Sequence, residues 1–171
     1  FIRLETGAAG SALGSGRGVL SAAVLTRRVL PVTRRLRFAI AYRHDAAWLQ
    51  ESGEQLPIED RFFSGGDGSV RGYDYRTLAP TRNGAVVGGQ VLLTGSVELE
   101  HPISSKLPAL LGAVFVDAGN AADRWGDMHP VFGYGLGVHY RSPIGPLRLD
   151  VAYGEDVKDW RFHISIGITF S

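Results

Sequence analysis

Apolar and polar residues alternate along most of the chain, and the alternation is clearest near its C-terminal end. From Phe162 to Phe170 every even position is apolar, and the positions between them are mostly polar or small. A β-strand places alternate side chains on opposite faces, so this period predicts a strand with one apolar and one polar face. The same alternation predicts strands at 35–43, 90–100, 131–141 and 147–154, with weaker ones at 1–10, 18–30 and 109–118.

Such two-faced strands occur both in soluble β-domains and in membrane barrels. A soluble sheet turns its apolar face toward a core. Three features favour the opposite arrangement, with the apolar face toward lipid. The strands are about 9–11 residues long, as a tilted membrane strand requires. Aromatic residues stand near the strand ends, and short connections alternate with long ones, which is typical of outer-membrane barrels.

The connections also predict how the strands are oriented across the membrane. Residues 101–108 and 142–146 form short, proline-containing turns, whereas 49–88 and 119–130 are long and polar. Outer-membrane barrels have short periplasmic turns and longer outer loops. We therefore expect 49–88 and 119–130 on the outer side and the C-terminus in the periplasm. The predicted fold is all-β, an antiparallel transmembrane β-barrel with about eight strands in this chain.

Composition removes several other classes of function. The chain has 171 residues, a net charge of +1 and no cysteine, so it has no basic footprint for nucleic acid and no thiol chemistry. No stretch approaches the roughly 18 consecutive apolar residues of a membrane helix. The histidines show no metal-ligand spacing, and no catalytic constellation or phosphate-binding loop is evident. We expect no catalytic residue, no metal and no cofactor.

The long connection at 49–88 is the most informative segment. Its length of about 40 residues is unusual for a structureless loop. It is rich in glycine, which permits tight reversals, and it contains too many aromatic residues for a freely solvated loop. We expect it to fold back into the lumen of a barrel. An eight-stranded barrel is filled by its own side chains, so the loop indicates a wider barrel to which this chain contributes only a part.

Within this loop, the run Arg61-Phe-Phe-Ser-Gly-Gly-Asp-Gly-Ser-Val-Arg-Gly-Tyr73 resembles the signature of the BamA/TamA superfamily of barrel-assembly and translocation proteins. Its continuation to Pro80 resembles the TamA branch more than the BamA branch. Further segments that resemble the family follow in order at 95–102, 113–120, 135–150 and 163–170. The resemblance therefore covers about residues 36–171.

The resemblance implies a barrel of about sixteen strands, preceded by periplasmic POTRA domains. Residues 1–171 would be its C-terminal part, without a POTRA domain. It further implies a non-enzymatic factor of the bacterial outer membrane, in contact with lipid, that inserts or secretes β-barrel or autotransporter proteins beside a periplasm-spanning, TamB-like partner. The alternatives are a BamA-type insertase, a two-partner secretion transporter, an outer-membrane lipase or protease, a passive pore and a soluble β-binding domain.

The resemblance also points to a candidate site around Val70-Arg71-Gly72-Tyr73. It implies that the guanidinium of Arg71 enters the lumen and meets the wall. By strand parity, Glu98, Phe115 and Asp117 share the lumen side of their strands. Asp117 can accept a bidentate pair, Glu98 is a second acceptor, and the Phe115 ring suits stacking by arginine. We hypothesise that Arg71 and Asp117 lock the loop inside the barrel.

A lateral gate between the first and last strands is a further implication of the resemblance. The last strand is predicted at 160–170. An edge strand offers unpaired N–H and C=O groups to an incoming strand. Gly167 could bend this strand, so we hypothesise that it is the hinge of the gate, with Ile168 and Phe170 as parts of the terminal strand signal.

The other charges predicted to face the lumen are interpreted as cross-strand pairs or solvated wall. They are His139, Arg148, Asp150, Arg161 and His163. The Gly133-x-Gly-x-Gly137 pattern lies inside a predicted strand. A bend or close packing explains it better than nucleotide binding does.

Overall fold

A computed structural model describes the backbone of residues 2–9, 19–31, 39–51, 58–143 and 145–167, and the side chains of residues 58, 59, 61–143 and 145–167. Its long strands are β1 (Ile2–Ala9), β2 (Val19–Pro31), β3 (Ala39–Glu51), β6 (Val91–Pro102), β7 (Leu110–Ala122), β8 (Val131–Ser142), β9 (Gly145–Gly154) and β10 (Asp159–Ile166). A short hairpin, β4 (Thr81–Arg82) and β5 (Ala85–Val86), and two single-turn 3-10 helices, η1 (Ile58–Asp60) and η2 (Trp125–Asp127), complete these elements.

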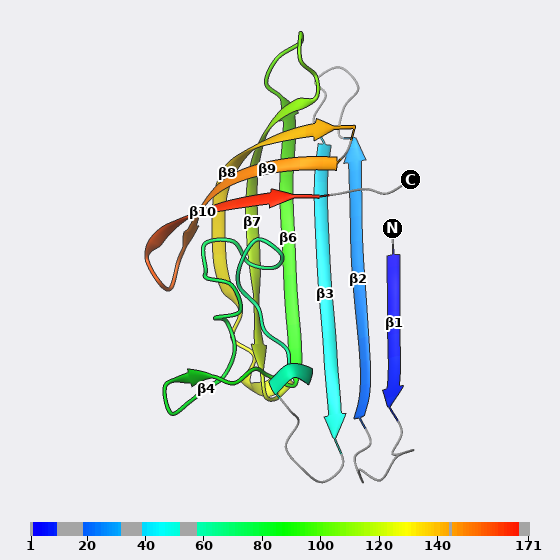
Figure 1. The fold of residues 1–171 in the computed structure, drawn as a ribbon, viewed down its shortest axis with the longest axis vertical. Coiled ribbons are helices and arrows are strands. Elements are labelled where there is room, and N and C mark those ends of the chain that lie inside the picture. Colours follow the sequence, from blue (N-terminus) through cyan, green and yellow to red (C-terminus); the bar gives the residue numbers. More distant parts are fainter. Residues whose placement is uncertain (1, 10–18, 32–38, 52–57, 144, 168–171) are drawn as a thin grey trace.

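The eight long strands form one antiparallel sheet in the order β1-β2-β3-β6-β7-β8-β9-β10. Each strand therefore pairs with its neighbour in sequence, and the longest insertion falls between β3 and β6. The sheet is strongly curved, and β8–β10 bend away from the direction of β1–β3 (Figure 1). Within the described residues β1 and β10 are its two edges. The predicted antiparallel all-β fold is confirmed.

Several predicted boundaries were wrong. The strand predicted at 35–43 is described from Ala39 and extends to Glu51, so residues 49–51 belong to β3 and not to the long loop. Likewise β7 extends to Ala122, so residues 119–122 are strand and not outer loop. The last strand, predicted at 160–170, is described as far as Ile166. Ile168 and Phe170 lie outside the described residues.

In a soluble protein the apolar face of a sheet is buried and the polar face is exposed, and in this sheet the arrangement is reversed. On the convex face, Phe162 is 81% and Ile164 71% exposed. On the concave face, Glu98 is 3% and Asp117 1% exposed. Apolar side chains exposed on one face of β6–β10 and charges buried on the other face are typical of a barrel sheet with lipid outside. No helix long and apolar enough to cross a membrane occurs in the part of the chain that the structure describes.

The segment 58–89 covers the concave face between β6 and β10 (Figure 1). Two antiparallel backbone bridges give it a defined base: Phe62 pairs with Gly89, and Ser64 pairs with Leu78. Gly89 is followed by Gln90, whose N–H donates to the carbonyl of Ala122 (2.8 Å). The segment is therefore fastened to the start of β6 and the end of β7. We call residues 58–89 the inner loop.

Candidate functional site: an arginine anchored on the concave face

A tight turn at the tip of the inner loop presents Arg71 to the sheet. The N–H of Gly66 donates to the carbonyl of Val70 (3.1 Å), and the N–H of Ser69 donates back to the carbonyl of Gly66 (3.1 Å). Gly65 and Gly66 have φ values of 101° and 96°, which side chains with a Cβ rarely adopt. The turn leaves Val70 fully buried and directs the next side chain toward the strands.

Arg71 uses nearly all of its donors. Its Nε and Nη2 donate to the two carboxylate oxygens of Asp117 at 2.7 and 2.9 Å, which is the bidentate geometry that arginine favours. Its Nη1 donates to Glu98 (2.9 Å) and Asp150 (3.0 Å). The backbone N–H of Arg71 also donates to Asp117 Oδ2 (3.1 Å). We call Arg71, Glu98, Asp117 and Asp150 the anchor cluster.

An aromatic ring completes the environment of Arg71. The guanidinium carbon lies 3.3 Å from the centroid of the Phe115 ring, where the ring quadrupole attracts a cation. Burial alone would lower the pKa of Arg71, but the hydrogen bonds and charges of Asp117 and Glu98 outweigh burial and raise this pKa. The guanidinium is therefore a permanent, desolvated cation among three carboxylates.

A second set of buried polar groups extends the anchor cluster along the strands. His139 contacts Glu100 through Nδ1 (3.0 Å) and Asp150 through Nε2 (2.9 Å). Because each ring nitrogen faces a carboxylate oxygen, both nitrogens must carry a proton if both carboxylates are ionised. Arg141 donates to the other oxygen of Glu100 (2.6 Å). Asp150 is therefore shared between Arg71 and His139.

Three of these groups, Glu98, Glu100 and His139, have potential metal-ligand atoms within 4.8 Å of one another. Both carboxylates already accept hydrogen bonds from cations, Glu98 from Arg71 and Glu100 from Arg141. We therefore interpret the three residues as part of the ion-pair network rather than as a metal centre.

Glycines on β8 make room for the inner loop. A Cβ at Gly133 would lie 1.8 Å from the carbonyl oxygen of Arg71, and one at Gly137 would lie 1.8 Å from Asp150 Oδ1. At Gly135 a Cβ would meet the Phe115 ring at 2.8 Å. The predicted close packing at Gly133-x-Gly-x-Gly137 is thus observed. The glycines therefore leave part of the concave surface of β8 without side chains, and the motif at residues 70–73 packs against this surface.

Gly72 and Tyr73 attach the motif to the last strands. The N–H of Gly72 donates to His163 Nε2 of β10 (3.0 Å). Burial raises the pKa of Tyr73, so its phenol stays protonated and donates to the carbonyl of Phe132 (3.0 Å). The same oxygen accepts the N–H of Asp156 (3.2 Å). Tyr73 therefore joins the inner loop to the start of β8 and to the turn between β9 and β10.

The structure brings four of the predicted site residues into contact: Arg71, Glu98, Phe115 and Asp117. Gly167 lies elsewhere, beyond the end of β10, where its N–H donates to the carbonyl of Pro146 (2.8 Å). Asp150 was interpreted from the sequence as part of a cross-strand pair or solvated wall. The structure does pair it across the strands with His139 (2.9 Å), but that interpretation missed its contact with Arg71. The sequence did contain a signal for this contact, because Asp150 occupies one of the alternate positions of β9 that are predicted to face the lumen.

Comparison with known proteins gives concordant matches. A family model described as Omp85 superfamily domain matches residues 1–170. The chloroplastic outer envelope protein 80 of Arabidopsis thaliana is 35% identical over 117 residues, which is 64% of this chain and 15% of that protein. The outer membrane protein assembly factor BamA of Nitratidesulfovibrio vulgaris is 31% identical over 138 residues, or 72% of this chain and 17% of that protein.

Among solved structures, BamA from Haemophilus ducreyi lacking POTRA domains 1–3 superposes with a TM-score of 0.65 and 22% sequence identity. The match covers 88% of this chain and 34% of that one, and at this identity it shows the fold. The chain spans less than a third of the length of each of these curated relatives.

Proposed function

Because this chain belongs to the Omp85 superfamily, we propose that it is the C-terminal part of an outer-membrane barrel that inserts or translocates other proteins without chemical turnover. The observation that carries the proposal is the inner loop, which is seated on the concave face through the buried Arg71. A convex face of exposed apolar side chains supports a lipid environment. A loop fixed across the concave face favours an assembly or secretion factor over a passive, open pore.

The anchor cluster has the role of locking the inner loop in place. Removing one member of a buried ion pair leaves an uncompensated charge and costs about 3–5 kcal/mol. Arg71→Ala and Asp117→Ala, made singly and together in the full-length protein, test direct coupling. We expect strongly non-additive losses in the protease resistance of the inner loop, because either change breaks the same contact. Additive losses would contradict the lock.

The lateral gate is the second element of the proposal. β10 pairs with β9 and is an edge of the sheet within the described residues, so its free N–H and C=O groups offer a template for an incoming strand. Gly167 is the proposed hinge, with Ile168 and Phe170 in the terminal strand signal. A Cβ at Gly167 would lie 3.0 Å from the Pro146 ring. If Gly167→Val leaves both strand pairing and assembly unchanged, the hinge has no role.

Finer assignments belong to the same proposal. The continuation of the motif from Tyr73 to Pro80 supports the TamA branch, and with it autotransporter-type substrates and a periplasm-spanning, TamB-like partner. The inner loop and residues 123–130 would lie on the outer side of a bacterial outer membrane, with the C-terminus periplasmic. Co-purification of such a partner from the native membrane, and labelling of a cysteine placed at Gly126 from outside cells, test these two assignments.

Reconstitution distinguishes the competing activities. The full-length protein in liposomes is offered an unfolded β-barrel substrate and, separately, an unfolded secreted substrate. Faster appearance of heat-modifiable, protease-resistant barrel supports insertion, whereas protection of the secreted substrate inside the vesicles supports two-partner secretion. Steady ion conductance without either reaction would support a passive pore and overturn the proposal. Lipase and protease assays on the same vesicles cover the enzymatic alternatives.

A further inference from the structure

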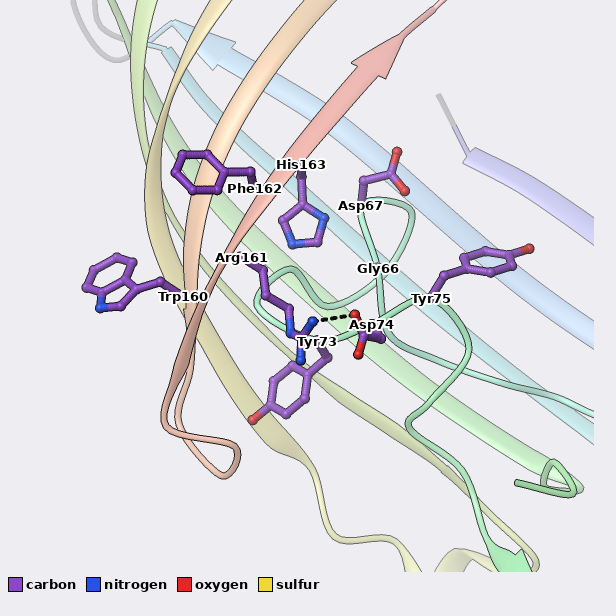
Figure 2. Close-up of a pocket in the computed structure, with 9 residues that line it drawn as sticks. All are labelled: Gly66, Asp67, Tyr73, Asp74, Tyr75, Trp160, Arg161, Phe162 and His163. Carbon is purple, nitrogen blue, oxygen red and sulfur yellow. Dashed lines mark hydrogen bonds and ion pairs between the residues drawn. The ribbon is translucent and has the colours of Figure 1, made fainter. Parts of the chain in front are cut away.

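An open pocket of about 420 Å³ lies between the tip of the inner loop and β10. Figure 2 shows Asp67, Tyr73 and Asp74 of the loop on one side and Arg161 and His163 of β10 on the other. The anchor cluster does not reach across this space, since the carboxylates that Arg71 contacts belong to β6, β7 and β9. The loop and β10 meet instead through two separate contacts at the pocket's edge.

The first contact is an ion pair between loop and strand. Arg161 Nη1 donates to Asp74 Oδ1, and the dashed line in Figure 2 marks it. The second is the hydrogen bond from the Gly72 N–H to His163 Nε2 (3.0 Å). Arg161 and His163 are two positions apart on the concave side of β10, opposite Ala152 and Asp150 of β9. We call these two interactions the edge contacts.

We propose that the edge contacts hold the terminal strand against the inner loop and open independently of the anchor cluster, so that β10 is released while the loop stays seated. Asp74 and Arg161 are positioning residues for β10. They act on the strand whose free edge is the proposed gate, and only this last link rests on the proposed function.

The chemistry of the edge contacts supports reversible opening. The side chains of Arg161 and Asp74 are 30% and 60% exposed, so water can replace each partner and the ion pair is worth little in free energy. Arg161 Nε has no hydrogen-bond partner among the described residues. The guanidinium is therefore held only at its outer end, mainly by Asp74, while Asp159 of its own strand lies 3.9 Å away.

The position of β10 explains why such contacts matter. In the described part of the chain β10 pairs only with β9, over eight residues. Its convex side chains are highly exposed, so they contribute little packing within this chain. A strand held on one side opens more readily than a central strand. Even weak additional contacts on its concave side then shift its opening equilibrium a few-fold.

Hydrogen exchange on the full-length protein in nanodiscs tests the proposal. Asp74→Asn and Arg161→Gln should each raise the exchange rate of the β10 amides that bond to β9 by about two- to fivefold. Exchange within residues 61–71 should stay unchanged, because the anchor cluster is intact, whereas the Gly72 amide, which donates to His163 of β10, should exchange faster together with β10. The charge-exchanged pair Asp74→Arg with Arg161→Asp should restore slow exchange in β10.

Asp159→Asn is the matched control, because it removes a carboxylate near Arg161 that belongs to β10 itself and not to the loop. It should leave β10 exchange unchanged. The inference is overturned if Asp74→Asn has no effect on β10, if Asp159→Asn has the same effect, or if loop and strand loosen together. This readout requires no substrate, so its outcome is separate from that of the reconstitution assay.

A cross-link gives a second measurement. The chain contains no cysteine, so Asp74→Cys with Arg161→Cys introduces one thiol on each side of the contact. Bridging the two thiols with a bifunctional methanethiosulfonate, whose spacer replaces the reach of the arginine side chain, should slow β10 exchange below that of the unmodified protein and, in the reconstitution assay, stop insertion until a reductant is added. Slowed exchange with full insertion would overturn the inference that release of β10 from the inner loop is part of the gate.

Discussion

Arg71 and Arg161 both connect the inner loop with the sheet, and their surroundings differ in burial, in the number of carboxylates and in aromatic contact. The Arg71 side chain is 6% exposed, meets three carboxylates and stacks on Phe115. Arg161 is 30% exposed in its side chain, meets one loop carboxylate and leaves Nε unpaired within the described residues. One loop is therefore fixed to the middle of the sheet and only lightly attached to its edge.

This difference shows how one loop can serve two mechanical roles. A buried cation surrounded by carboxylates is costly to separate because each partner would remain desolvated. An exposed pair exchanges with water at little cost. The strong site lies on β6, β7 and β9, and the weak one lies on β10, where movement is proposed. The following experiments test this contrast, from the largest expected effect to the smallest.

Arg71→Ala should have the largest effect. Asp117, Glu98 and Asp150 would lose their shared cation, so we expect a loss of about 3–5 kcal/mol and rapid cleavage of the inner loop by protease. Arg71→Lys should recover only part, because an ammonium cannot form the bidentate pair. Arg82→Ala, which removes an exposed arginine of the same loop, is the control and should behave like the unmodified protein.

Gly133→Ala should have the next largest effect, because the added Cβ disturbs the packing of the inner loop against β8 without changing a charge. The added Cβ would lie 1.8 Å from the Arg71 carbonyl oxygen, so either the loop or β8 must move. Overpacking of this kind costs about 1–3 kcal/mol and occasionally more. Gly68→Ala, where a Cβ meets nothing within 4 Å, is the matched control. If the two variants unfold at the same temperature in a heat-modifiability assay, close packing of the inner loop against Gly133 is contradicted.

His139→Leu should have an intermediate effect. It removes a donor from both Glu100 and Asp150 while Arg71 keeps its contacts with Asp117 and Glu98. We expect destabilisation of about 1–3 kcal/mol, as for a buried acceptor left unpaired. Loop proteolysis should rise less than in Arg71→Ala. The exposed His129 provides the control substitution, His129→Leu, and a loss of equal size there would exclude a specific role for His139.

High salt should produce the smallest effect and should separate the two regions directly. Exposed charges are screened within about 3 Å at 1 M ionic strength, whereas buried pairs are screened much less. Raising salt should therefore speed exchange in β10 about as much as Asp74→Asn does, and it should leave the protease resistance of the inner loop unchanged. If the loop is cleaved faster at high salt, the anchor cluster is more hydrated than its burial indicates.

The sequence predicted the strands and their faces because a period of two is a local property. From parity alone, Glu98, Phe115 and Asp117 could be placed on one face, and the structure puts all three against Arg71. Register is not local. Asp150 lies opposite Gly137 of β8 and His163 of β10, and this alignment leaves it free of a cross-strand arginine partner. Its contact with Arg71 therefore required the three-dimensional pairing.

The boundary errors have a related cause. Residues 119–122 are small or polar and resemble a turn, yet they complete β7. The base of the inner loop rests on them, and a Cβ at Gly89 would lie 2.4 Å from the carbonyl oxygen of Ala122. A Cβ at Gly119 would likewise lie 2.5 Å from the carbonyl oxygen of Leu93 on β6, so the glycine accommodates the approach of another backbone rather than a chain reversal. Such an approach comes from a distant segment and leaves no local signal.

The anchor cluster has a consequence for the order in which this chain folds. The acceptors of Arg71 lie 27, 46 and 79 residues after it, so most of its binding surface is synthesised later than the loop. Contacts between residues far apart in the sequence form slowly, because the chain loses the entropy of loop closure before the contact contributes any stabilisation. The inner loop can therefore complete its contacts only after β9 has joined the sheet, because Asp150 of β9 is one of the acceptors of Arg71.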